Sequence, residues 1–248
     1  MKILTKCNDS FKVLLCHISP KALSKYLYHR TFKKRLNLEN PVGFNEKLMW
    51  LKLKVYNNNP VVWQCSDKYH VREFVKSCGI SEDHLPKLIN TYLTPEEIDY
   101  NKLPKKFALK CSHGCGFNII CQDKKKLNQK EINKKLRKWL KTKFGYKTAE
   151  THYMHIKPRI ICEEFIENQK GEFPIDYKLY CFNGKPKLVL VCVDRKEHYQ
   201  TAFYDMEWNH MPFYGLNPMH GPVAKPAAKP AAKPAAYESM KEIARKLS

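Results

Sequence analysis

The sequence predicts an α+β fold with antiparallel sheets and a helical N-terminal region, and three observations lead to that class. Before residue 80, apolar residues recur every three or four positions, which is the period of amphipathic helices. From residue 87 to 205, short runs rich in Val, Ile, Tyr and Phe alternate with turn residues, as strands do. The dipeptide Asn183-Gly184 lies between two such runs and is a strong hairpin signal, so the strands are expected to pair antiparallel.

Five segments are expected to be helical: 19–38, 44–58, 66–80, 129–144 and 237–248. The second is expected to begin at Asn45 and to bury Trp50, because polar Asn suits a helix N-cap and the apolar stripe includes the ring. The third is expected to begin at Ser66 and to stop at Gly79. Strands are expected at 87–93, 106–111, 118–124, 159–166, 199–205 and on both sides of the turn within 176–195.

The chain carries a formal charge of +21, from 45 Lys and Arg against 24 Asp and Glu, so its surface should attract anions. Nucleotides, nucleic acid, anionic polymers and an acidic membrane face all fit, and nothing points to sequence-specific nucleic acid. No apolar stretch of ~20 residues and no export signal is evident, so the ten cysteines are expected to be reduced. We expect a cytoplasmic protein, with the basic helix at 19–38 suited to peripheral contact with the inner membrane face.

A glycine-bearing turn, Cys-Ser-His-Gly-Cys-Gly, separates two apolar runs and fits three interpretations. Structural zinc is disfavoured, because Cys111, His113, Cys115 and Cys121 lack the paired spacing of zinc ligands. An ordinary hairpin turn is the simplest interpretation.

Phosphate binding is the third interpretation of this turn. Gly114 and Gly116 would let backbone amides approach an anion, Ser112 offers a hydroxyl donor and Lys110 supplies charge. The order of these residues differs from that of a Walker loop.

The sequence resembles the TupA-like ATP-grasp family in four segments that occur in a fixed order: 67–88, 103–124, 159–167 and 176–195. Proteins of this family are encoded in bacterial surface-polysaccharide gene clusters and act in teichuronopeptide or capsule synthesis. The resemblance spans roughly residues 40 to 248, and 44–53 is similar to the family's first helix. It implies an ATP-grasp-like fold in which nucleotide lies between two antiparallel-sheet subdomains. The boundaries that follow are a helical region at 1–90, a lid at 91–158, a second sheet at 159–223, a Lys-Pro-Ala repeat linker at 224–236 and a final helix at 237–248.

The resemblance also implies the nucleotide-binding residues. Lys68 and Lys110 would bind phosphates, under a flexible cover formed by Ser112, Gly114, Gly116 and Asn118. Glu163 and Glu164 would lie where a hinge meets adenine, one facing the nucleotide and the other solvent, and the sequence does not say which.

Three further residues are implied as nucleotide-binding: Asp176 and Lys178, which suit a ribose or phosphate contact, and Arg195. Asp176 and Lys178 share one strand face, and Arg195 follows the next strand beside Asp194. Salt bridges are the alternative role for these side chains.

The family activity is ATP-dependent joining of a carboxylate to an amine, with ATP and Mg²⁺ as cofactors. Its magnesium ligands are expected on late acidic strands, and the chain is expected to end at Ser248 before them, which would weaken catalysis. A glycosyltransferase of capsule synthesis and a non-catalytic binder of anionic polymer or membrane are the alternatives. The polysaccharide or amino-acid acceptor is not indicated.

Overall fold

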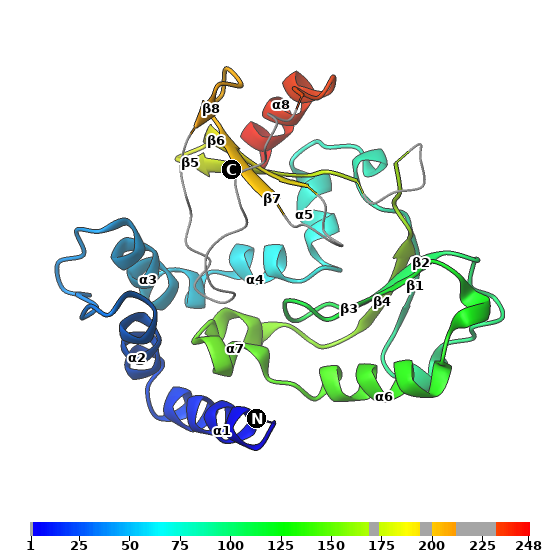
Figure 1. The fold of residues 1–248 in the computed structure, drawn as a ribbon, viewed down its shortest axis with the longest axis horizontal. Coiled ribbons are helices and arrows are strands. Elements are labelled where there is room, and N and C mark those ends of the chain that lie inside the picture. The colour runs from blue at the N-terminus through cyan, green and yellow to red at the C-terminus, as the bar shows by residue number, and fades with distance from the viewer. Residues whose placement is uncertain (1, 169–173, 194–199, 212–231) are drawn as a thin grey trace. The chain divides into compact units, whose positions relative to one another are not determined.

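A computed structural model of the chain describes residues 2–168, 174–193, 200–211 and 232–248 (Figure 1). The chain divides into two compact units, each described by itself below. The first unit comprises Met1–Phe74 and Leu85–Phe165, and the second comprises Val75–His84 and Ile166–Ser248. Arg195, Asp194 and residues 224–231 of the repeat, all of which figure in the expectations above, lie outside the described residues.

The helices with residues in the first unit are α1 (Lys2–Ile18), α2 (Pro20–Phe32), α3 (Phe44–Lys54), α4 (Pro60–Ser66), α5 (Val71–Ser77), α6 (Gln129–Leu140) and α7 (Phe144–Thr148). Single 3-10 turns lie at Tyr56–Asn58, Glu82–His84, Pro95–Glu97, Lys124–Lys126 and Thr151–His155. The sequence pattern does not predict α1. That helix joins α2 and the end of α7 through a small core of Cys16, Leu23 and Ala149.

Three details of the predicted helices are wrong. The helix α3 is capped at Gly43 rather than at Asn45, because the Glu46 carboxylate reaches back to accept the Gly43 N–H at 3.0 Å. Trp50 is 36% exposed rather than buried, since α3 presents no fully buried side chain. Ser66 ends α4 instead of capping α5, because Pro60, with Asn59 as N-cap, begins a helix there.

The first sheet has the strand order β1-β4-β2-β3, with every pair antiparallel. Its strands are β1 (Leu88–Tyr92), β2 (Phe107–Cys111), β3 (Asn118–Cys121) and β4 (Ile160–Glu164). In this sheet β4 pairs with β1 on one side and with β2 on the other. An apolar strand such as Ile160–Cys162, fully buried on both faces, suits this central place.

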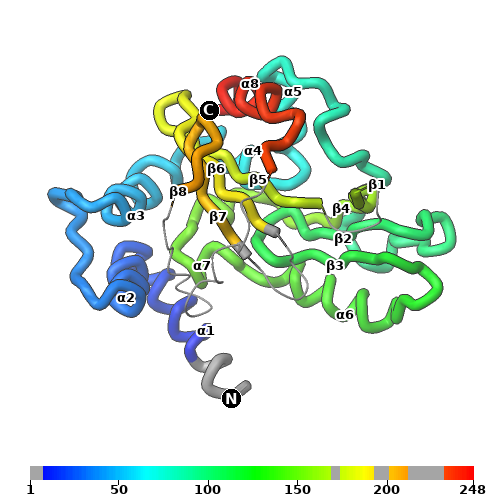
Figure 2. The backbone as a smooth tube through the Cα atoms, turned by 45° about the horizontal axis from the view of Figure 1, so that its top comes forward, coloured from blue at the N-terminus to red at the C-terminus, as the bar shows by residue number. Residues whose placement is uncertain are grey.

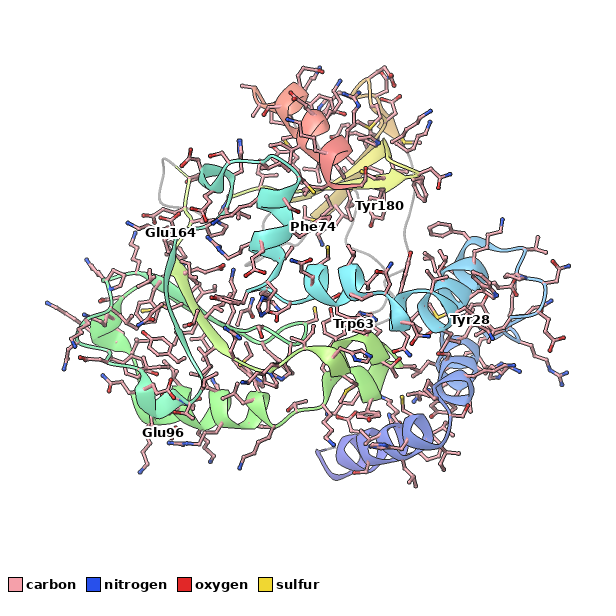
Figure 3. The ribbon with its side chains drawn as sticks, turned by 180° about the vertical axis from the view of Figure 1, so that it is seen from behind. Tyr28, Trp63, Phe74, Glu96, Glu164 and Tyr180 are labelled. Atoms are coloured by element: carbon pink, nitrogen blue, oxygen red, sulfur yellow. The ribbon has the colours of Figure 1, made fainter. Side chains whose placement is uncertain are left out.

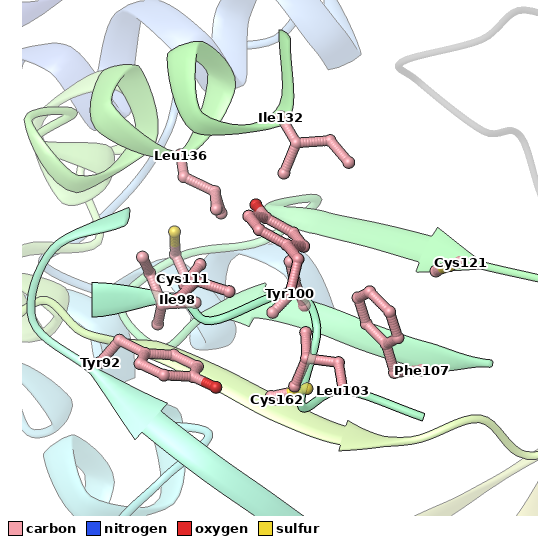
Figure 4. Packing of buried hydrophobic residues seen from close by; sticks show 12 residues of the cluster. Tyr92, Ile98, Tyr100, Leu103, Phe107, Cys111, Cys121, Ile132, Leu136 and Cys162 are labelled. Atoms are coloured by element: carbon pink, nitrogen blue, oxygen red, sulfur yellow. The ribbon is translucent and has the colours of Figure 1, made fainter. Parts of the chain in front are cut away.

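Successive side chains of β2 lie on opposite faces of the sheet. Phe107, Leu109 and Cys111 point toward α6 and form a core with Ile132 and Leu136 of that helix (Figure 4). The lysines of α6 at 130, 134, 135 and 138 are exposed, as the sequence predicts for a solvated face. The opposite face of β2 carries Ala108 and Lys110, which leaves that lysine on the side away from the α6 core.

The second unit contains a sheet in the order β5-β6-β7-β8 (Figure 2). Its elements are β5 (Asp176–Phe182), β6 (Lys185–Val193), β7 (Gln200–Tyr204), β8 (His210–Met211) and α8 (Tyr237–Leu247). The predicted hairpin between β5 and β6 is confirmed: Asn183 has φ 49° and Gly184 has φ 74°, the left-handed pair of a type I′ turn. Tyr237 of α8 completes a core with Val189, Val191 and Tyr204.

Two four-stranded antiparallel sheets combined with helices confirm the predicted α+β class. Among the described residues, none of the helices has both the length and the apolar character needed to cross a bilayer.

Candidate functional site

A buried ion pair joins β2 and β4 on the face away from α6. Glu163 lies directly opposite Ala108, and Lys110 is two residues further along that face. The Lys110 Nζ lies 2.5 Å from Glu163 Oε2, and the carboxylate side chain is only 6% exposed while the lysine side chain is 27% exposed. Glu163 rather than Glu164 therefore shares a face with Lys110.

Arg72, in the first turn of α5, supplies a second cation to the same carboxylate. Its Nη1 lies 3.4 Å from Glu163 Oε1, and its side chain is 13% exposed. A buried carboxylate is strongly unfavourable unless it is paired, and here each oxygen has its own cationic partner. Sequence reasoning missed Arg72, because its partner lies 91 positions away and no local pattern marks it.

Lys68 reaches the glycine turn from the segment between α4 and α5. Its N–H donates to the Ser112 carbonyl at 3.3 Å, and its Nζ donates to the Gly114 carbonyl. Burial lowers the pKa of Lys68 from the usual 10.5, and the neighbouring charge of Lys110 lowers it further, although the nearby Cys115 thiol acts in the opposite direction. Lys68 and Lys110 therefore lie near enough for their positive charges to interact, in a half-buried place where an anion would stabilise both.

The two glycines of the turn serve different purposes. A Cβ on Gly114 would lie 2.7 Å from the Phe117 ring, so that residue is glycine because the ring packs against it. Gly116 has φ 75° and open space around it, so its left-handed backbone is what requires glycine. The half of the turn at Ser112–Gly114 is buried, and the half at Cys115–Gly116 is exposed.

Ser112 is positioned by main-chain contacts on two sides. Its N–H donates to the Arg159 carbonyl at 2.9 Å, and its carbonyl accepts from Lys68. Its hydroxyl is buried and has no hydrogen-bond partner among the described residues. A buried hydroxyl without a partner destabilises the fold, because its donor is not satisfied. A phosphate oxygen bound by the two lysines could accept this hydrogen bond.

The four candidate zinc donors are not gathered at one point. Cys111 and Cys121 are buried in the α6 core, whereas Cys115 is exposed on the turn. His113 is buried with Nε2 3.1 Å from the Trp139 carbonyl oxygen. Within the described ranges, no group of three or more His, Cys, Asp or Glu residues is placed to hold a metal ion.

Two buried histidines, His113 and His152, are expected to make the stability of the first unit depend on pH. Burial lowers the pKa of His113 from 6.5, and burial lowers the pKa of His152 in the same way. Between each lowered pKa and 6.5 the unfolded chain binds more protons than the folded chain, so acidification favours unfolding.

We therefore expect the free energy of unfolding, measured by urea denaturation, to fall as the pH drops below 6.5 through these lowered values. The double substitution His113→Gln and His152→Gln should flatten that dependence. An unchanged slope would show that these histidines do not carry it.

The remaining predicted residues occupy two places. Asn118 is exposed and directly opposite Lys110 across the β2–β3 pair. Glu164 is exposed at the end of β4 (Figure 3). Its carboxylate accepts the Lys87 N–H at 3.0 Å. Asp176 and Lys178 belong to the second unit and form a 3.8 Å ion pair along β5.

A sequence model of the family described as TupA-like ATP-grasp matches residues 46–248. The curated proteins and the solved structures that were searched gave no match.

Proposed function

Because the chain belongs to the TupA-like ATP-grasp family, we propose that Lys68 and Lys110 bind the phosphates of ATP in a ligase of bacterial surface-polysaccharide synthesis. ATP-grasp domains bind ATP, generally with Mg²⁺, and have ligase-like activity. The observation that carries the residue assignment is the buried hydroxyl of Ser112, which has no hydrogen-bond partner among the described residues. Lys68 donates its N–H to the Ser112 carbonyl, and Lys110 lies two positions before Ser112 in the chain.

The proposed reaction joins a carboxylate to an amine. A carboxylate oxygen takes the γ-phosphoryl group and ADP leaves, and the amine then attacks the carbonyl carbon while phosphate leaves. Lys68 and Lys110 would stabilise the negative charge on the transferred phosphoryl group. Mg²⁺ would neutralise part of the same charge, and we assign it no ligand among the described residues. We place this reaction in the cytoplasm, where ATP is available.

Glu163 would face the nucleotide in this proposal, because it lies on the lysine face, and the exposed turn around Gly116 would cover the phosphates. Asn118 lies beside Lys110 and would contact the same ligand. Asp176 and Lys178 are proposed to contact ribose or phosphate, and Arg195, which lies outside the described residues, is proposed to bind the nucleotide, as the family resemblance implies.

A calorimetric titration series tests phosphate binding. Affinity should fall from ATP to ADP to AMP, because each lost phosphate removes an interaction with the lysines. The exposed Lys138 of α6 provides a control: Lys138→Ala should leave the series unchanged, since it lies on a solvated face. Equal affinities for ATP and AMP would contradict phosphate binding by Lys68 and Lys110.

A further inference from the structure

Glu163 is shared between two cations, and this sharing leaves the site with excess positive charge. One carboxylate oxygen contacts Lys110 at 2.5 Å and the other lies 3.4 Å from Arg72. If Lys110 alone paired with Glu163, the two charges would cancel and the carboxylate would oppose an incoming phosphate. With Arg72 included, two positive charges face one negative charge, before Lys68 is counted.

We propose that Arg72 is a positioning residue for nucleotide binding, which engages Glu163 so that Lys110 can turn its charge toward a phosphate. Arg72 does not itself bind the nucleotide in this proposal. It acts through Glu163: Arg72 donates to Oε1 of that carboxylate, whereas Lys110 donates to Oε2. This inference rests on the proposed function, because it assigns Lys110 a phosphate ligand.

Arginine suits this role better than lysine would. A guanidinium stays protonated in proteins, whereas an ammonium readily loses its proton when it is buried among like charges. Burial and the charge of Lys110 already lower the pKa of Lys68 in this same site. An arginine at position 72 therefore keeps its charge where a further lysine would tend to lose it.

The burial of Glu163 adds a second reason. When Lys110 moves to a phosphate, the carboxylate would be left buried and unpaired if no other cation were present, which is costly. Arg72 remains as its partner and reduces that cost. The contribution of Arg72 to ATP affinity should therefore depend on the negative charge of Glu163.

A double-mutant cycle tests this dependence by calorimetry with ATP. We expect Arg72→Gln to weaken ATP binding about tenfold, within the range typical of coupling between neighbouring sites. In chains that also carry Glu163→Gln, the same substitution should change affinity by less than about twofold, because no charge is left to share. Arg72→Lys should restore part of the affinity.

Arg137→Gln is the matched control, because Arg137 forms a 2.6 Å pair with Glu96 on the exposed face of α6. It should leave ATP affinity unchanged. Equal losses from Arg72→Gln with and without Glu163→Gln would overturn the inference, as would an Arg72→Gln protein that binds ATP like the parent.

A second measurement works without nucleotide. Lys110 should be acylated more slowly by acetic anhydride in Arg72→Gln than in the parent, because Glu163 then pairs with the lysine alone. Mass spectrometry of the peptide containing Lys110 gives the rate, and an unchanged rate would contradict charge sharing. If the parent binds no ATP, the proposed function fails, and the acylation rates alone decide whether Arg72 and Lys110 share Glu163.

Discussion

Replacing Lys110 by alanine is expected to weaken ATP binding by about 30-fold to 100-fold, the size of one lost charge-assisted hydrogen bond with a phosphate. The loss is expected because Lys110 is one of two ammonium groups that face the proposed phosphate position. Isothermal titration calorimetry of the parent and Lys110→Ala measures it directly. Glu163 keeps Arg72 as a partner in this variant, so the fold should survive.

Lys68→Met provides a companion variant that separates binding from folding. Burial in the folded chain lowers the pKa of Lys68 from 10.5, so the protonated lysine lowers the free energy of unfolding at neutral pH. This loss of stability disappears only as the pH rises through the lowered pKa toward 10.5, where the folded chain releases the proton. Removing the charge therefore offsets the loss of its contact with Gly114, and the urea midpoint should fall little while ATP binding is lost. Full ATP affinity in both variants would contradict the phosphate role.

Tyr237→Ala is expected to destabilise the second unit by about 3–5 kcal/mol, the usual cost of truncating a large buried aromatic side chain. Tyr237 is only 1% exposed, and its ring meets Trp208 edge-on at 4.9 Å. Its hydroxyl also donates to the Met206 carbonyl at 3.2 Å. The ring thus attaches the first residue of α8 to the β5–β8 sheet.

Hydrogen exchange followed by mass spectrometry locates this effect. Peptides from β5, β6 and α8 should exchange faster in Tyr237→Ala, whereas peptides from the first sheet should keep the exchange of the parent. Tyr237→Phe retains the ring and loses only the hydroxyl contacts, so it should cost about 1 kcal/mol. Unchanged exchange in β5 and β6 would mean that α8 does not stabilise the sheet.

The strands and the β5–β6 hairpin could be predicted because local sequence determines them. Asn183-Gly184 supplies the left-handed backbone that a two-residue turn needs, and the apolar runs set the strand positions. The buried face of α6 could be predicted equally well, because its apolar residues recur with the helical period. At these places the short-range pattern and the tertiary structure agree.

Other features depend on contacts between distant positions. The place of β4 between β1 and β2, and the sharing of Glu163 by Lys110 and Arg72, involve partners dozens of residues apart. The sequence predicts that Glu163 and Glu164 point to opposite faces of the sheet, because they are neighbours in a strand. Only the register of β4 with β2 shows which of the two shares a face with Lys110. Trp50 was misplaced because an apolar stripe indicates a helix but does not show whether another element covers it.

The buried thiols between the first sheet and α6 can be used to measure how often this core opens. Burial raises the pKa of Cys111 and Cys162 to about 12, so in the folded chain they are shielded and also protonated. Cys65 and Cys115 are exposed and should react with an alkylating reagent first. Timed alkylation of the unaltered protein would therefore report how often the sheet separates from α6, without any engineered probe or dye.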